Sequence, residues 1–142
     1  MSFLGAPYPI IQDPKGFLRT TTGVDQIKSD LLVLLLTEPG ERVMLPDFGT
    51  PLRKFIFEPN DSVVNEQVKE AIANSISLWE PRIAIQDIEV VNGASSDISG
   101  DLNELDTGQN APHILLIKIR FSNFDSIDTV EELELRLPTG GV

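Results

Sequence analysis

The sequence contains no cysteine and a single histidine, His113. The lack of cysteine excludes disulfide bonds and thiolate metal sites, and it is typical of a protein that matures in a reducing compartment. No cluster of His, Asp and Glu residues has the spacing of metal ligands, so we predict neither a metal site nor a cofactor. A lone histidine at the start of a predicted strand is more often a surface residue than a catalytic base.

Basic residues are scarce as well. The chain has 11 Lys and Arg against 22 Asp and Glu, a net charge of −11, and after residue 86 there are 11 acidic residues and only 3 basic ones. Because lysine and arginine supply most of the affinity for phosphate backbones, we predict no direct contact with nucleic acid. The acidity fits either solubility alone or electrostatic docking to a partner.

Long hydrophobic runs are missing too. The longest, residues 31–36, is far too short to cross a bilayer, so we predict no membrane contact. The first dozen residues lack the basic and apolar regions of a secretory signal peptide, and we expect none. With 142 residues, 41% of them hydrophobic, the chain is expected to form a single domain with a buried core.

Proline and polar clusters divide the chain. Three early prolines predict an extended N-terminal arm over residues 1–16, which could lie against its own domain or reach a neighbour. The domain is expected over residues 17–137 and includes a long acidic surface loop at 93–112, rich in Gly, Ser, Asp and Asn. Residues 138–142 are predicted to form a flexible tail.

Two segments have the periodicity of helices. The first is predicted over Val24–Thr37, with Thr22 as N-cap and Pro39-Gly40 as the stop, and its apolar second half is expected to be buried from several directions. The second follows residue 61 and ends before Pro81. Its apolar stripe consists of Val64, Val68, Ala71, Ile72, Ser75, Ile76 and Trp79.

Three alternating segments predict strands near residues 83–90, 113–121 and 129–137, with an irregularity at Gln86-Asp87. Outward residues are basic on the second segment and acidic on the third, which favours antiparallel pairing of these two. Residues 41–57 are expected to form short extended pieces joined by turns. We therefore predict an α+β fold with two main helices packed on a mostly antiparallel β-sheet in a single domain.

The segment from Trp79 to Ile83 lies where the second helix ends and the first long strand begins. Pro81 fixes the backbone there, so Glu80 and Arg82 are expected to project from a rigid corner. A carboxylate and a guanidinium in fixed geometry can pair with each other and close the corner, or they can bind charges on a partner. The residues alone leave both alternatives open.

A glycoside hydrolase is the one enzymatic reading that these residues allow, because that reaction uses two carboxylates. Glu80 is the best candidate for the acid, and Asp47 is a much weaker candidate for its partner. The nearby Arg82 would stabilise ionised Glu80, whereas a general acid must hold a proton. We therefore predict that the chain is not an enzyme; an unrelated soluble binding module is the third class considered.

Residues 39–49 (PGERVMLPDFG), with the following Leu52, resemble the signature of the baseplate wedge family of contractile-tailed phages, type VI secretion baseplates and related injection machines. The downstream Glu80-Pro81-Arg82 is similar to that family's second motif, at the matching place after the second helix. The two motifs in this order and at this spacing are a fairly specific signal. The resemblance covers roughly residues 17–137.

The resemblance implies a structural wedge subunit on which the sheath starts to assemble, in a virion tail baseplate built in the host cytoplasm. Implied partners are the helical core bundle of other wedge proteins, the tail sheath, and the tail tube or hub. Members have often carried a lysozyme label, and a peptidoglycan hydrolase of the tail is the alternative. The implied partner-binding residues are Glu80, Pro81, Arg82, Arg42, Asp47 and Phe48, to which Arg53 and Lys54 could add.

Two expectations about mechanism follow. The C-terminal strands alternate without an internal proline, so we expect one sheet edge to accept strands donated by the first sheath ring. Charge reversal at Arg82 is expected to leave the domain folded but to stop its incorporation into wedges. Loss of Trp79, by contrast, is expected to damage the fold.

Overall fold

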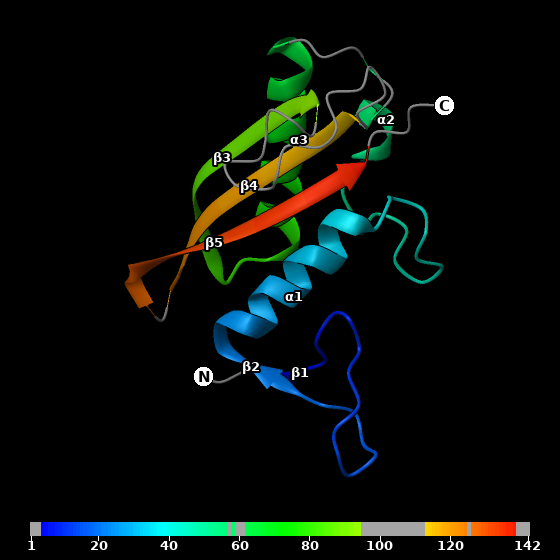
Figure 1. Cartoon of the computed structure of the whole chain (residues 1–142), viewed down its shortest axis with the longest axis vertical. Helices are drawn as coiled ribbons and strands as arrows, with labels where there is room; N and C mark the ends of the chain where they lie inside the picture. Colours follow the sequence, from blue (N-terminus) through cyan, green and yellow to red (C-terminus); the bar gives the residue numbers. More distant parts are fainter. Residues whose placement is uncertain (1–3, 57, 59–61, 95–112, 125, 139–142) are drawn as a thin grey trace, which may run out of the picture.

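The structure is a computed structural model that describes residues 4–56, 58, 62–94, 113–124 and 126–138 of the chain. Helices and antiparallel strands confirm the predicted α+β class (Figure 1). The strands β3, β4 and β5 form a three-stranded sheet in that order, and the short strands β1 and β2 pair separately. The elements are β1 (Leu4–Gly5), β2 (Thr21–Thr22), α1 (Gly23–Leu36), α2 (Arg53–Ile56), α3 (Ser62–Trp79), β3 (Ile83–Ala94), β4 (His113–Asn123) and β5 (Ser126–Pro138).

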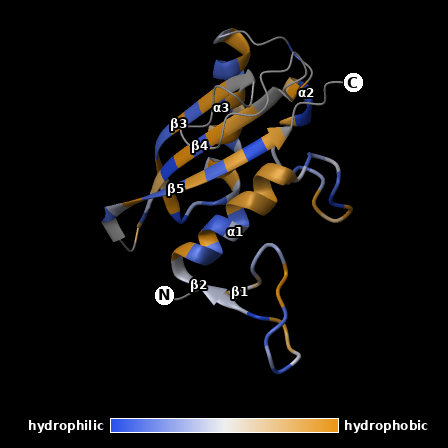
Figure 2. Ribbon diagram, in the orientation of Figure 1, coloured by the Kyte–Doolittle hydropathy of each residue, from blue (hydrophilic) through white to orange (hydrophobic). Residues whose placement is uncertain are grey.

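Helix α1 begins and ends within one residue of its predicted bounds. Thr22 is at the N-cap position as predicted, but its side chain makes no capping hydrogen bond. Figure 2 shows that the C-terminal half of α1 is mainly hydrophobic. Leu31, Leu34 and Leu35 are buried, yet Leu36 is 41% exposed. The expectation of burial from several directions therefore fails at Leu36, which lies at the margin of the core.

Helix α3 has the predicted apolar stripe. Its fully buried residues are spaced four apart, as one face of a helix requires: Val64, Val68, Ile72 and Ile76. Trp79 is half-buried at the last position, and Pro81 follows two residues later. The stop before Pro81 is thus confirmed, because proline disfavours helical backbone in the preceding residue.

The segment over residues 41–57 was predicted as short extended pieces joined by turns; the turns are confirmed, but a helical turn rather than an extended piece follows them. Residues 43–47 form turns, and the one-turn helix α2 follows. Local hydrogen bonds stabilise the turns: the Gly40 amide donates to the Pro46 carbonyl at 2.7 Å, and the Phe48 amide donates to the Leu45 carbonyl at 3.1 Å. With its backbone groups satisfied inside the loop, the segment needs no partner strand.

The sheet confirms the predicted strands, and a register shift between Ile85 and Asp87 confirms the irregularity. Strands β4 and β5 pair antiparallel, with Lys118 opposite Glu134 and Arg120 opposite Glu132. The side chain of Arg120, however, bonds to Asp87 on the other neighbouring strand, β3. The predicted antiparallel pairing with basic residues facing acidic ones is therefore confirmed, whereas the ion pair of Arg120 forms across the opposite side of β4.

The core lies between the helices and one face of the sheet. In Figure 1, α3 runs behind the sheet and α1 lies beside β5. Three completely buried side chains represent its three sources, Leu31 from α1, Val68 from α3 and Phe121 from β4. No helix among the described residues is both long enough and apolar enough to span a bilayer.

The described part of the N-terminal arm folds back on itself, beside the start of α1. Strand β1 pairs with β2, and an isolated bridge joins Gln12 to Leu18. We call residues 4–22 the N-terminal lobe; it projects from the start of α1 (Figure 1). The predicted acidic loop lies mainly, and the C-terminal tail almost entirely, outside the described residues, so those two predictions stay as they are.

Candidate docking site

The corner between α3 and β3 holds a bidentate ion pair. Glu80 is buried, with 5% of its surface exposed. Nε and Nη2 of Arg82 donate to its two carboxylate oxygens, each at 2.5 Å. Two parallel bonds between a guanidinium and a carboxylate fix both side chains in one plane. The alternative in which the two residues pair with each other is therefore realised in the isolated subunit.

A second carboxylate joins this pair from helix α1. Nη2 of Arg82 also donates to Oδ2 of Asp30 at 2.5 Å, which ties α1 to the corner across 52 residues of sequence. The hydrogen bond to Glu80 first, and that to Asp30 next, raise the pKa of Arg82 against the opposing effect of burial. The guanidinium therefore carries its charge at any ordinary pH.

Asp30 is held in turn by Gln26, one helical turn earlier. The Gln26 amide nitrogen donates to Oδ1 of Asp30 at 2.7 Å, and the amide oxygen accepts from the Thr21 hydroxyl at 2.6 Å. Strand β1 packs directly on this amide, because a Cβ on Gly5 would lie 2.3 Å from the Gln26 side chain. A continuous polar chain thus runs from the N-terminal lobe to the corner.

The first motif meets the second in space. The Arg42 guanidinium lies over the Phe48 ring, 4.4 Å from its centroid, and Phe48 packs edge-on against Trp79 at 5.3 Å. Gly49 makes the return to α1 possible, since its φ of 125° and its closeness to the Thr37 carbonyl leave no room for a Cβ. Both motifs and α1 line one cleft of about 320 Å³, formed by Asp30, Val33, Leu34, Arg42, Phe48, Trp79, Glu80 and Arg82.

The predicted site residues are therefore only partly together. Glu80, Arg82, Arg42 and Phe48 line this corner cleft, and Pro81 is exposed at the corner itself. Asp47 is exposed on the loop and does not line the cleft.

The weaker candidates Arg53 and Lys54 lie on α2 and also do not line the cleft. Both are exposed; Arg53 lies 3.9 Å from a carboxylate oxygen of Glu41, and the Lys54 ammonium lies over the Phe55 ring. Asp30 and Gln26 were missed by sequence reasoning. No sequence signal separates them from the other polar residues in the first half of α1, Asp25, Lys28 and Ser29.

The geometry argues against one expectation, that charge reversal at Arg82 leaves the domain folded. Arg82 neutralises a buried carboxylate and a half-buried one, so a third acid in its place would leave like charges together in a poorly hydrated corner. A variant at Arg82 alone therefore mixes folding with docking. A sound test must change Glu80 and Arg82 together.

The cleft also bears on catalysis. Its two carboxylates, Asp30 and Glu80, both accept hydrogen bonds from the same guanidinium, whereas glycoside hydrolysis needs one carboxyl group as a proton donor and a second one free to act as base or nucleophile. Among the residues that the structure describes, no group of three or more His, Asp or Glu side chains could hold a metal ion. The arrangement is suited to binding charge.

Comparison with known families gives a match over residues 21–121 to the model of the baseplate wedge protein gp25 family. The match spans well over half of the chain and includes both motifs and every residue that lines the corner cleft. The chain belongs to the gp25 baseplate wedge family.

Two relatives within the wedge family show how far the similarity extends. The baseplate wedge protein gp25 of Enterobacteria phage T4 is 28% identical over 115 residues, covering 81% of this chain and 75% of its own length. Baseplate protein W of Escherichia phage P2 is also 28% identical, over 63% of this chain and 80% of its own length.

Solved structures share the fold. A chain of the anti-feeding prophage baseplate superposes with a TM-score of 0.62 at 22% identity, over 98% of this chain and 87% of that one. A Geobacter sulfurreducens protein described as a candidate tail lysozyme gives 0.59 at 24% identity, over 80% and 87%. At this identity the likeness establishes the fold alone. With the family match, the chain is a structural wedge protein of a contractile tail baseplate, a virion component that works among other baseplate proteins.

Proposed function

We propose that this wedge protein docks on neighbouring wedge proteins through its corner cleft and starts sheath assembly at the edge of β5. The observation that carries the first half is the meeting of both motifs in one cleft, although they lie some thirty residues apart in sequence. If each motif served only to fold its own segment, their side chains would not be expected to line the same cleft. A helical bundle of wedge proteins is the partner that the family resemblance suggests.

The roles of the corner residues differ. Glu80 is buried and acts through Arg82, whose orientation it fixes. The Arg82 side chain is 25% exposed and lies at the cleft, where its charge can meet a carboxylate or the C-terminus of a helix on the partner. Pro81 and Arg42 are exposed beside it. Docking therefore uses a cation that has been positioned in advance, and no proton transfer is needed.

The second half of the proposal concerns sheet β3-β4-β5. Strand β5 pairs with β4 on one side only, and no described strand pairs with its outer side. Helix α1 contacts β5, with an ion pair between Lys28 and Glu131, and residues 132–137 are the stretch of β5 that we propose accepts the added strand. Main-chain hydrogen bonds from an added strand would complete this edge. Exposed Glu132, Glu134 and Arg136 discourage aggregation until that strand arrives.

Hydrogen exchange tests the edge directly. In purified tails, the outward-facing backbone amides of residues 132–137 should exchange at least about tenfold more slowly than in the isolated subunit, since a paired amide must open before it exchanges. The amides of β4 are the internal control, because β4 is central in both states and should change little. Unchanged exchange along β5 in sheathed tails would refute strand addition.

Peptidoglycan hydrolysis is the second candidate, favoured by the structural neighbour described as a candidate tail lysozyme. We expect purified protein to clear peptidoglycan no faster than a Glu80→Gln variant, because both cleft carboxylates are tied to Arg82. If the parent clears peptidoglycan robustly and the Glu80→Gln variant does not, the protein is a hydrolase and the proposed docking role of the corner is wrong.

A further inference from the structure

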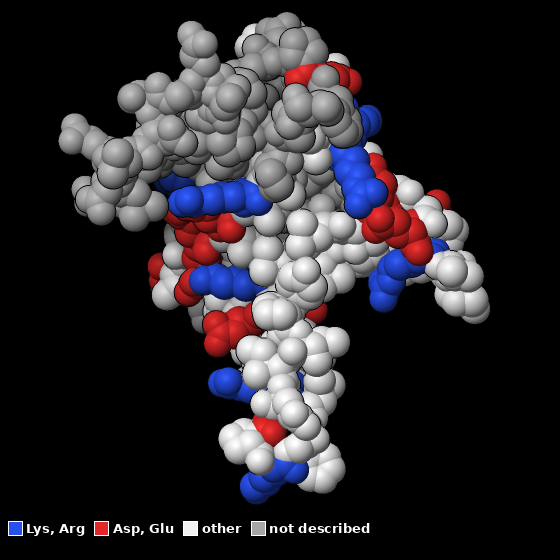
Figure 3. All heavy atoms as spheres, turned by 45° about the vertical axis from the view of Figure 1, so that its right-hand side comes forward, with Lys and Arg blue, Asp and Glu red and all other residues white. Residues whose placement is uncertain are grey.

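Two large apolar side chains next to the corner cleft are left uncovered. Val43 and Met44 are each 92% exposed, more than any other large hydrophobic residue that the structure describes. They lie at the tip of the loop between α1 and α2, which projects at the right in Figure 1. In Figure 3 this loop ends in uncharged surface beyond a cluster of charged side chains. Isolated exposed hydrophobic residues are common, but two adjacent ones at the tip of an ordered loop call for an explanation.

The loop that carries this pair is internally braced. The Gly40 amide donates to the Pro46 carbonyl, the Leu45 amide donates to the Arg42 carbonyl at 3.2 Å, and the Glu38 amide donates to a Glu41 carboxylate oxygen at 3.0 Å. These bonds hold the tip in place, although its two apolar side chains contribute nothing to the core. Because the loop is already ordered, its backbone loses little conformational entropy when a partner buries the tip, which favours binding.

The tip is continuous with the corner cleft. Arg42 immediately precedes Val43 and lies over Phe48, which itself packs on Trp79 of the corner. A protein that covers the cleft therefore also reaches the tip. We propose that Val43 and Met44 are an apolar anchor that inserts into an apolar pocket of the same baseplate protein that covers the corner cleft. This anchor rests on the proposed docking function and names the chemistry of its partner.

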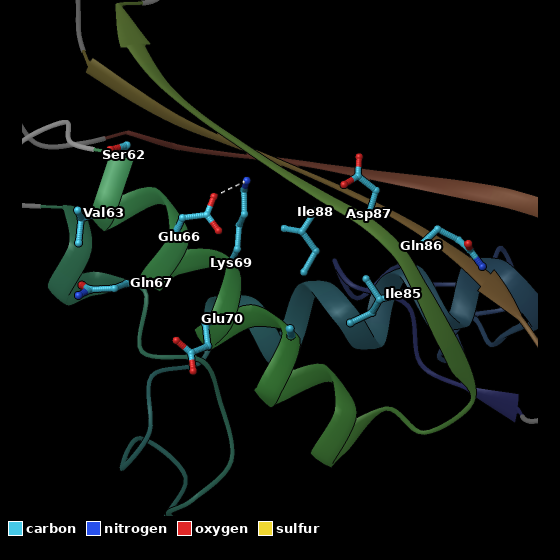
Figure 4. Close-up of a pocket in the computed structure, with 11 residues that line it drawn as sticks. Ser62, Val63, Glu66, Gln67, Lys69, Glu70, Ile85, Gln86, Asp87 and Ile88 are labelled. Carbon is cyan, nitrogen blue, oxygen red and sulfur yellow. Dashed lines mark hydrogen bonds and ion pairs between the residues drawn. The ribbon is translucent and has the colours of Figure 1, made fainter.

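The other conceivable receptor is a groove on a second copy of this chain. It lies between α3 and β3, has a volume of about 800 Å³, and includes the apolar residues Val63, Ala73, Ile85 and Ile88 (Figure 4). Its acidic side chains are partly paired already, Glu66 with Lys69 and Asp87 with Arg120. Because each copy has a net charge of −11 and the anchor loop adds exposed Glu41 and Asp47, contact between copies is electrostatically opposed. A separate baseplate protein is the better fit.

The first test replaces both anchor residues with serine, Val43→Ser with Met44→Ser. Since neither side chain is buried, the melting temperature should stay within about 2 °C of the parent, because exposed substitutions seldom change stability much. Affinity for wedges reconstituted from purified tail proteins without this subunit should fall about 100-fold, the loss expected when two anchors leave their pocket. Leu78→Ser, on an exposed position of α3, is the matched control and should bind normally. Full affinity of the double variant would overturn the proposal.

The second test identifies the receptor. Because the natural chain has no cysteine, Met44→Cys carries a unique photo-cross-linking label into reconstituted wedges. Among chains that incorporate, a cross-link to another baseplate protein supports the anchor, whereas a cross-link only to a second copy, or none at all, overturns it. A folded Met44→Cys chain that fails to incorporate counts as support, because it repeats the loss of affinity.

A third chain, Glu80→Gln with Arg82→Gln, separates this inference from the proposed function. If that chain binds normally while the serine variant does not, the corner is not the docking site and the anchor stands. If the serine variant binds normally while the glutamine variant does not, the anchor fails and the corner stands.

Discussion

Replacing Arg82 with alanine is expected to lower the free energy of unfolding by about 2–4 kcal/mol, somewhat less than the loss for a fully buried ion pair because Arg82 is partly hydrated. The change removes both bonds to Glu80 and the bond to Asp30. Glu80 would then be left as an uncompensated charge with 5% of its surface exposed. Its desolvation, more than the lost attraction, accounts for the size of the effect.

Urea denaturation measures the loss for the alanine variant. The interaction between positions 80 and 82 is measured separately by a double-mutant cycle of four chains: the parent, Arg82→Gln, Glu80→Gln and the double glutamine variant. Arg82→Gln alone should be destabilised clearly more than the double variant, since the latter leaves no unpaired charge at position 80. The double variant is also the folded chain in which docking can be tested. Equal stability of all four would mean that the corner pair does not hold the fold together.

Replacing Trp79 with alanine is the second large effect, and we expect a loss of about 2–4 kcal/mol, near the lower end for tryptophan because the side chain is only half-buried. Its ring packs against Phe48, and the Arg42 guanidinium in turn lies over the Phe48 ring. The variant should therefore loosen the 41–49 loop as well as the end of α3. Docking is expected to weaken more than stability alone explains.

Trp79→Phe is the matched control, because it keeps an aromatic face for Phe48 at smaller volume. It should recover more than half of the stability lost in the alanine variant, read from urea midpoints at constant slope. Binding to reconstituted wedges should recover in parallel. If alanine and phenylalanine at this position behave alike, the contact between Phe48 and Trp79 is not what positions the loop.

Much of the fold follows from local pattern. Helix α3 was predictable because one apolar residue per turn from Val64 to Ile76 and a stop at Pro81 both act within a few residues. Strands β4 and β5 and their antiparallel pairing were predictable for a similar reason, since alternation fixes the inward face and opposite charges on facing residues favour pairing. The class of the fold needs little beyond these elements.

The site was less predictable, since its decisive contacts are long-range. Nothing local to Asp30 indicates that it bonds to a guanidinium 52 residues away, and nothing near Gly5 indicates that it packs on Gln26. Glu80 and Arg82 could be identified as a pair, but whether they face each other or a partner depends on how α1 crosses the corner. The turns between 41 and 49 could be predicted from their prolines and glycines, but the hydrogen bonds that brace them, such as that from the Gly40 amide to the Pro46 carbonyl, could not.

In the proposed docking mode, folding and docking share residues. Glu80 and Asp30 hold Arg82, and Phe48 and Trp79 hold the loop beside it, so a partner that docked here would meet groups already in position. Pre-organisation of this kind reduces the entropy cost of each new contact. It also explains why single changes at the corner are expected to affect stability and assembly together.

A map of the native tail at side-chain resolution tests the docking claim most directly. The account predicts that another baseplate protein covers the cleft around Arg82 in every copy of this subunit, and that a sheath strand lies alongside residues 132–137. A cleft that faces solvent in the assembled baseplate, with the guanidinium bonded only to Glu80 and Asp30, would contradict it.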